Sequence, residues 1–246
     1  MLTDKSTQQI PTITFRTQEN NTWENINTDE IFNNKTVIVF SLPGAYTPTC
    51  SSSHLPRFNE LAPVFRQHGV DEIVCISVND TFVMNEWKKD QEAENITMIP
   101  DGNAEFTDAM GMLVDKSDLG FGKRSWRYSM LVKNKIIEKM FIEPEVEGDP
   151  FEVSDADTML NYINPNAIIP KSATMFSRKG CPHCKKAIDL LSKNNIYTEI
   201  IELGSGVTSR SLRAVSGQST TPQIFIGGKY IGGASELEHY FNTGEK

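Results

Sequence analysis

The chain has 246 residues, of which 38% are hydrophobic and 23% charged, and a formal net charge of −8. This length allows one large domain or two small ones with a buried core, and no apolar run approaches the roughly 20 residues that cross a bilayer. The negative charge opposes nucleic-acid binding and gives no polybasic membrane patch, and the start of the chain shows no secretory signal, so we expect a cytoplasmic protein with small-molecule or protein partners.

The first half of the chain alternates between strand and helix patterns. A nearly continuous β-branched and aromatic run at 36–42 indicates a strand that is buried on both faces. After Cys50, apolar residues recur at helical spacing until Gly69, which predicts an amphipathic helix. This alternation predicts an α/β fold. Further elements are expected as strands at 72–78, 96–100, 128–132 and 136–142, the last two joined as a hairpin, and as a helix at 81–90.

A second α/β unit is predicted behind a short connector. Two prolines and little helical periodicity mark 164–171 as a linker, so we assign 1–163 to a first domain and 172–246 to a second. The second domain is short, but it lies within the size range of domains that fold alone. Its expected elements are strands at 173–177 and 197–201, helices after Cys181, at 209–216 and from Ser235, and a hairpin over 223–233.

The four cysteines, Cys50, Cys75, Cys181 and Cys184, are too few for a disulfide framework in a chain of this length. A thiol reacts as its thiolate, and the free N–H groups and dipole of a helix N-terminus favour that anion. Cys50 has such a position, although by itself this leaves a buried, inert cysteine equally open. Cys75 lies in the middle of a predicted strand, and we interpret it as a small buried hydrophobe.

The segment PGAYTPTC, residues 43–50, resembles the active-site motif of peroxiredoxins, and with the following SSSHLPRF it is similar to the peroxiredoxin-5 subfamily. The resemblance implies that Cys50 is the peroxidatic nucleophile, that Pro43 shields its sulfur, and that Thr47 hydrogen-bonds the sulfur and the peroxide. The family's arginine on a later strand matches Arg127, whose guanidinium would stabilise the thiolate and orient the peroxide. Attack on a peroxide oxygen would leave a sulfenic acid on Cys50.

The residues around this motif bear on how the sulfenic acid is reduced. Relatives with an internal resolving cysteine carry it after the hairpin, but residues 143–160 contain none, so an external thiol is needed. Arg124 is a second cation near the motif, and we interpret it as a surface arginine. His54 lies four residues after Cys50, where it could tune the thiolate, but we interpret it as a hydrogen-bonded structural histidine.

The motif CPHC, residues 181–184, lies between a predicted strand and a predicted helix. Cys181 is therefore expected at the helix N-terminus, with Pro182 at the first helical position. We expect no metal, because a structural zinc site needs four ligands and no second CxxC or paired histidine follows. Haem attachment is excluded because Lys185, not histidine, follows the motif.

The same motif, followed by TTPQIFIGG at 220–228 and by IGGASELEHY, resembles glutaredoxins over 173–241. The resemblance implies that Cys181 is the nucleophile and Cys184 a secondary thiol. It also implies a cis proline at Pro222 and a glutathione site built by the backbone of Thr221 and by Lys179, Gly232, Gly233 and Ser235.

Both resemblances together predict two thioredoxin-like domains in one glutathione-dependent peroxidase for hydrogen peroxide and alkyl hydroperoxides. Glutathione would be a co-substrate, no cofactor would be tightly bound, and the chains would form a homo-oligomer with contacts between the two kinds of domain within or between chains. Three alternatives stay open: a peroxide sensor or docking protein, a glutathione-dependent disulfide reductase, and a glutaredoxin that holds an iron–sulfur cluster.

Overall fold

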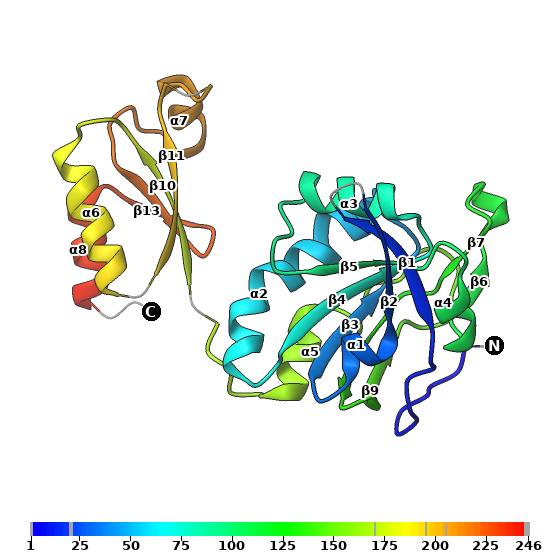
Figure 1. The fold of residues 1–246 in the computed structure, drawn as a ribbon. Coiled ribbons are helices and arrows are strands. Elements are labelled where there is room, and N and C mark those ends of the chain that lie inside the picture. The colour runs from blue at the N-terminus through cyan, green and yellow to red at the C-terminus, as the bar shows by residue number, and fades with distance from the viewer. Residues whose placement is uncertain (1, 20–21, 170, 195, 205, 244–246) are drawn as a thin grey trace. The chain divides into compact units, whose positions relative to one another are not determined.

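The computed structural model describes residues 2–19, 22–169, 171–194, 196–204 and 206–243. The chain divides into two compact units, Met1–Ala167 and Ile168–Lys246, and each is an α/β structure (Figure 1). The division falls inside the segment 164–171 that we predicted as a linker. Within the described ranges, no helix is long and apolar enough to cross a membrane.

A five-stranded sheet forms the centre of the first unit, in the order β5-β4-β3-β8-β9. Strands β3, β4 and β5 run parallel, whereas β8 is antiparallel to β3 and pairs with β9 in the predicted hairpin. The run predicted to be buried on both faces is β3, because Ile38 and Phe40 pack on one face while Val37 and Val39 pack on the other. The strands span Thr36–Ser41 (β3), Glu72–Ser77 (β4), Thr97–Pro100 (β5), Tyr128–Lys133 (β8) and Ile136–Ile142 (β9).

Helices cover both faces of this sheet (Figure 1). One face packs against apolar residues of α2 (Leu55–Gln67), α3 (Thr81–Asp90) and α5 (Ala156–Ile163), among them Phe58, Trp87 and Met159. The other packs against α1 (Thr28–Phe32) and α4 (Glu105–Ala109) through Phe32 and Phe106. The helices predicted after Cys50 and at 81–90 are thus α2 and α3. Helices on both faces support the sheet that carries the loop before Cys50.

Several short elements of the first unit were not predicted. Strands β1 (Thr14–Glu19) and β2 (Thr22–Asn27) form an antiparallel pair of their own, and β6 (Leu113–Asp115) pairs with β7 (Lys123–Ser125). A 3-10 turn, Ser117–Leu119, lies between β6 and β7. These strands are largely polar and partly exposed, so their sequences lack the apolar alternation that reveals a half-buried strand.

The second unit has a four-stranded sheet in the order β11-β10-β12-β13, with β10 and β11 parallel and the others antiparallel. Helices α6 and α8 pack on one face through Cys184, Leu191 and Leu237, and α7 packs on the other through Leu212. All the elements predicted for this unit are present. They span Ser172–Ser177 (β10), Pro182–Lys193 (α6), Tyr197–Glu202 (β11), Ser209–Ser216 (α7), Gln223–Ile226 (β12), Lys229–Gly232 (β13) and Ala234–Thr243 (α8).

Candidate active sites

Cys50 lies in the first turn of a helical segment that begins at Pro48, after the loop that leaves β3. Residues Cys50–His54 form a π-helical turn that continues into α2, and the Ser51 N–H donates to the Thr47 carbonyl at 3.0 Å. Such wide turns often occur at functional sites. The thiol has no exposed surface, so an oxidant has to approach it through the residues around it.

A cavity of about 340 Å³ opens beside this turn. Its walls are mostly apolar, and Leu119 and Phe121 keep large exposed fractions, 59% and 41%. The predicted residues Pro43, Thr47 and Arg127 all line it, so two separate parts of the sequence meet at one pocket. The other lining residues are Pro48, Thr49, Lys116, Trp126, Gly148, Asp149 and Pro150.

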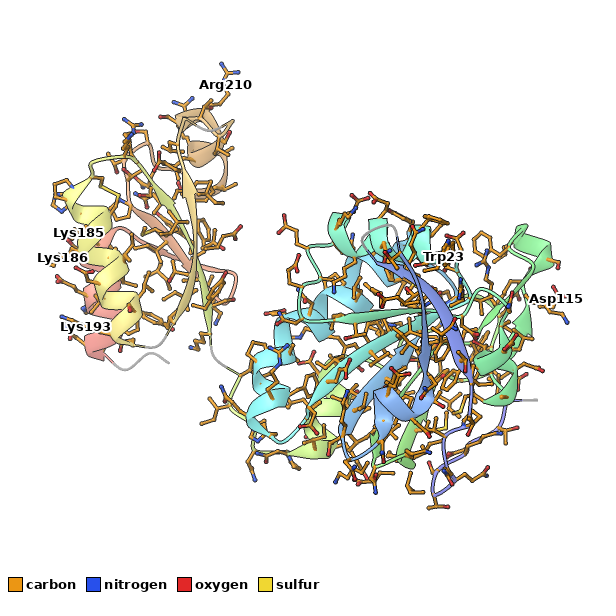
Figure 2. All side chains as sticks on the ribbon, viewed as in Figure 1. Trp23, Asp115, Lys185, Lys186, Lys193 and Arg210 are labelled. Atoms are coloured by element: carbon orange, nitrogen blue, oxygen red, sulfur yellow. A yellow bond between two sulfur atoms is a disulfide. The ribbon has the colours of Figure 1, made fainter. Side chains whose placement is uncertain are left out.

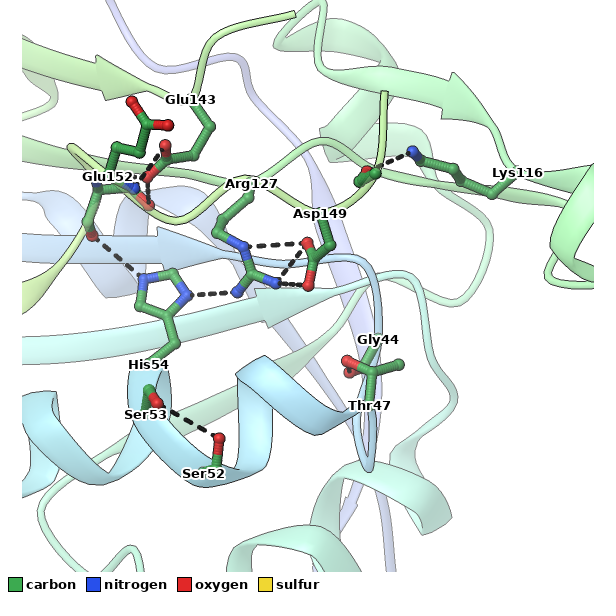
Figure 3. A network of polar contacts seen from close by, with 12 residues as sticks. Gly44, Thr47, Ser52, Ser53, His54, Lys116, Arg127, Glu143, Asp149 and Glu152 are labelled. Carbon is green, nitrogen blue, oxygen red and sulfur yellow. Dashed lines mark hydrogen bonds and ion pairs between the residues drawn. The ribbon is translucent and has the colours of Figure 1, made fainter. Parts of the chain in front are cut away.

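Arg127 is buried just before β8, with a relative exposure of 1%. Its Nε and Nη2 atoms donate to the Asp149 carboxylate at 2.5–3.2 Å, and Nη1 lies 3.1 Å from His54 Nδ1 (Figure 3). Burial opposes the positive charge, but the hydrogen bonds to Asp149 and the charge of the nearby Cys50 sulfur outweigh it, and the pKa of Arg127 is raised. A permanent cation therefore lies close to the Cys50 sulfur.

His54 is a buried, uncharged link between Arg127 and the backbone. Because Arg127 is only a donor, His54 Nδ1 must accept from it, which leaves the ring proton on Nε2 to donate to the Ser154 carbonyl at 3.1 Å. Burial, together with the charge of Arg127, lowers the pKa of His54 to about 3. The histidine is hydrogen-bonded and structural, in agreement with our interpretation of the sequence.

We expect His54 to make the folded state sensitive to acid. Its imidazole is neutral in the folded protein but gains a proton in the unfolded chain below its ordinary pKa of 6.5, so acid favours unfolding. The free energy of unfolding is therefore unaffected by His54 protonation above about pH 6.5, and it decreases as the pH falls from there towards 3. In urea unfolding followed by circular dichroism, wild type should lose about 1.4 kcal/mol per pH unit more than His54→Asn over this interval. Equal slopes in the two proteins would contradict a neutral buried His54.

The loop that supplies Asp149 is fastened by the buried carboxylate of Glu143. Glu143, just after β9, accepts hydrogen bonds from the N–H groups of Glu152, Val153 and Ser154 at 2.8–3.0 Å and from the Ser154 hydroxyl at 2.7 Å. This carboxylate therefore holds the segment that carries the Ser154 carbonyl contacted by His54 (Figure 3). The site thus depends on a continuous polar network and not on Arg127 alone.

The remaining sequence-predicted residues of the first unit fall into different environments. The Thr47 hydroxyl donates to the Gly44 carbonyl at 2.9 Å, and among the hydrogen bonds of the described residues there is none from Thr47 to Cys50, so its role at the sulfur stays a prediction. Arg124 does not line the cavity and donates to the carbonyls of Val78 and Phe121. Burial, together with the charge of Cys50, raises the pKa of Cys75 well above its usual value, which agrees with an inert thiol.

Trp87 contacts the residue that follows Cys50. Its indole Nε1–H donates to the Ser51 hydroxyl at 3.0 Å, and its ring is fully buried between α3 and the sheet. The contact links α3 to the π-helical turn of the site.

The second candidate site lies at the start of α6. Cys181 is the N-cap residue, its sulfur accepts from the Cys184 N–H at 3.1 Å, and Pro182 occupies the first turn, as predicted. Cys181 and Cys184 form a disulfide in which Cys181 is partly exposed and Cys184 is buried. An incoming thiol can therefore reach the sulfur of Cys181 more easily than that of Cys184.

Two of the residues predicted to bind glutathione lie beside these cysteines. The Thr221–Pro222 peptide bond is cis, as the resemblance implies, and the Thr221 carbonyl lies 3.6 Å from the Cys181 sulfur. The Thr221 hydroxyl also points to that sulfur, at 3.8 Å. The side chain of Thr221 therefore lies near the Cys181 sulfur as well, whereas the resemblance implies a contact through the backbone of Thr221.

The other predicted glutathione contacts differ in what surrounds them. A Cβ at Gly232, whose φ is +127°, would come within 2.8 Å of the Glu236 side chain, which explains the need for glycine. Glu236 already accepts from the Gly233 N–H at 2.9 Å, while Ser235 and Lys179 are exposed. Further lysines, Lys185, Lys186 and Lys193, project from α6 (Figure 2). The glutathione assignments stay predictions.

Asp149 and Glu143 were missed in the sequence. Both lie in the acidic stretch after β9, which contains no cysteine and shows no motif in sequence. An acidic residue followed by a run of exposed neighbours looks like solvated surface, and only the fold brings Asp149 to a buried arginine 22 residues earlier.

Sequence comparisons find relatives for both units. The chain matches the Redoxin family over residues 5–160 and the Glutaredoxin family over residues 173–231. The hybrid peroxiredoxin hyPrx5 of Haemophilus influenzae is 62% identical over 234 residues, which cover 95% of this chain and 97% of the relative. Peroxiredoxin sll1621 of Synechocystis is 53% identical over 169 residues, covering 63% of this chain and 89% of that protein.

Solved structures resemble the larger part of the chain. Reduced Prx3 of Vibrio vulnificus in complex with hydrogen peroxide is 38% identical, with a TM-score of 0.62, and the match covers 65% of this chain and 99% of that one. The antioxidant protein of Plasmodium falciparum, described as a 1-Cys peroxiredoxin, is 37% identical with a TM-score of 0.63, covering 66% of this chain and 100% of that one.

Proposed function

Because this chain belongs to the peroxiredoxins, in the hybrid form in which a glutaredoxin domain follows the peroxidase domain, we propose that it is a thiol peroxidase driven by glutathione, with Cys50 and Cys181 as its two nucleophiles. One observation carries the assignment of Cys50: the buried guanidinium of Arg127 lies close enough to the sulfur for the two charges to interact, beside a cavity that opens to solvent. A cation held in a site of low dielectric stabilises the thiolate that reacts with peroxide.

The proposed first step is a displacement at oxygen. The Cys50 thiolate attacks the terminal oxygen of hydrogen peroxide or an alkyl hydroperoxide, the O–O bond breaks, and the leaving oxygen departs as water or alcohol after taking a proton. Cys50 becomes a sulfenic acid. Arg127 is the residue placed to stabilise the negative charge that passes from sulfur to the leaving oxygen.

The proposed second stage returns the electrons from glutathione. A glutathione thiolate attacks the sulfenic sulfur, the S–OH bond breaks, and the hydroxide leaves as water after taking a proton from solvent, which leaves a mixed disulfide on Cys50. The Cys181 thiolate takes the glutathionyl group by thiol–disulfide exchange, and a second glutathione frees Cys181 as oxidised glutathione forms. Supporting this order, Cys181 is the more exposed cysteine of its pair and lies at a helix N-terminus.

The glutathione requirement can be tested with the purified full-length chain. A hydroperoxide is added to protein, glutathione, glutathione reductase and NADPH, and the fall in NADPH absorbance is followed. We expect turnover in this mixture without any thioredoxin. Turnover that appears only when thioredoxin and its reductase replace glutathione would contradict the role of the second unit.

A further inference from the structure

The guanidinium of Arg127 has two edges, and each has a different partner. Its outer edge, Nε and Nη2, is taken by both oxygens of Asp149, while Nη1 contacts His54 Nδ1. This paired geometry is the one in which arginine binds any carboxylate, including a free one in solution. Asp149 therefore fills a place that a small anion would otherwise take.

The charges near Arg127 make Asp149 its main fixed counter-ion. His54 is uncharged, and the carboxylate of Glu143 is turned to the backbone of 152–154. Cys50 supplies a negative charge only while it is a thiolate, and its oxidation to sulfenic acid changes that charge during the reaction. Asp149 keeps Arg127 paired throughout.

Asp149 also lies where an incoming oxidant would pass. Its side chain is 38% exposed and lines the cavity together with Thr47 and Arg127, so it lies on the path of an incoming oxidant. The loop is held in place by Glu143, and the Phe151 ring packs against the Arg127 guanidinium at 5.4 Å. A negative group fixed at this position repels anions but leaves an uncharged hydroperoxide unaffected.

We propose that Asp149 is the internal counter-ion of the peroxidatic site: it positions Arg127 and closes the outer edge of the guanidinium to free anions, so that the pocket selects uncharged hydroperoxides. This role rests on the proposed function of Cys50. Asp149 acts through Arg127 and is a positioning and specificity residue, since no contact with the sulfur is attributed to it.

The test measures formation of the Cys50 sulfenic acid in the reduced full-length protein. Samples mixed with hydrogen peroxide are quenched with dimedone at set times, and the adduct is quantified by mass spectrometry. Each protein is measured in sodium chloride and in sodium acetate of equal ionic strength. For Asp149→Asn we expect the rate in chloride to fall about fivefold, because the guanidinium loses its fixed orientation. Acetate should inhibit this variant further, at concentrations on the order of 10 mM, because a charged carboxylate can displace the neutral amide from that edge of the guanidinium.

Matched variants separate this role from a general effect of charge. Glu147→Gln removes the same charge from the same exposed loop, and both it and wild type should be insensitive to acetate. Asp149→Glu should restore the insensitivity. Acetate inhibition of wild type, an unaltered Asp149→Asn, or the same acetate response in Glu147→Gln would each overturn the proposal. A dimedone adduct that survives in Cys50→Ser would instead overturn the proposed function, whatever Asp149 does.

Discussion

Replacing Cys50 by serine is expected to lower hydroperoxide consumption by at least about a thousandfold, to the level of the buffer blank. A serine hydroxyl is a much weaker acid than a thiol, so the anionic nucleophile that the proposed mechanism requires is lost. The change is small in volume, and Cys50 lies in the first turn of a helical segment, where serine is readily accommodated. The loss should therefore appear in activity and not in the circular dichroism spectrum.

Cys75 provides the matched control for this experiment. It is the other free cysteine of the chain and is equally buried, but it lies in the middle of β4. Cys75→Ala should keep nearly full activity, because burial keeps that thiol protonated and unreactive. If Cys75→Ala lost peroxidase activity while Cys50→Ser kept it, the nucleophile would have been assigned to the wrong thiol.

Replacing Cys181 by serine should separate the two stages of the reaction. Turnover with glutathione, glutathione reductase and NADPH is expected to fall about a hundredfold, because the tethered exchange partner of the glutathionylated Cys50 is lost. A single round of Cys50 oxidation by peroxide should proceed at the wild-type rate, since Cys181 takes no part in that step. The two readouts are NADPH absorbance for turnover and dimedone trapping for the single round.

The partner cysteine of the same motif is the control for Cys181. Cys184 is buried, and the monothiol route passes through Cys181 alone, so Cys184→Ser should retain most of the turnover. Equal losses in the two variants would show that the dithiol is required and that the disulfide between them lies on the catalytic path. Unchanged turnover in Cys181→Ser would remove the second unit from the mechanism.

The sequence revealed those parts of the fold whose residues face a core. The run at β3 is apolar on both sides because helices cover both faces of the sheet, and the apolar spacing of α2 matches its buried Leu55, Phe58, Leu61 and Phe65. Strands β1 and β2 lack this signature. They pair only with each other and not with the five-stranded sheet. Phe15 of β1 is buried against that sheet, but Trp23 of β2 remains 46% exposed, so the pair shows no regular apolar alternation that would reveal it.

Some residues of the candidate site could likewise be predicted from the sequence, whereas others could not. Cys50, Pro43 and Thr47 belong to one short motif, and Arg127 was found because the resemblance implies an arginine on a later strand. The partners that orient Arg127 were harder to find. His54 was recognised as structural but not as its acceptor, and Asp149 reaches it from a loop with no regular structure. The Thr47 hydroxyl donates to the Gly44 carbonyl. The choice of such an acceptor depends on side-chain rotation, which the spacing of residues in a sequence does not reveal.

The contact between Trp87 and Ser51 gives the peroxidatic turn an optical reporter. Indole emission depends on the polarity and hydrogen bonding around the ring, and this ring is bound to the residue next to Cys50. The other tryptophans, Trp23 and Trp126, also belong to the first unit. A stopped-flow trace of tryptophan emission would therefore report on changes in the first unit, including the turn that carries Cys50, without any added dye.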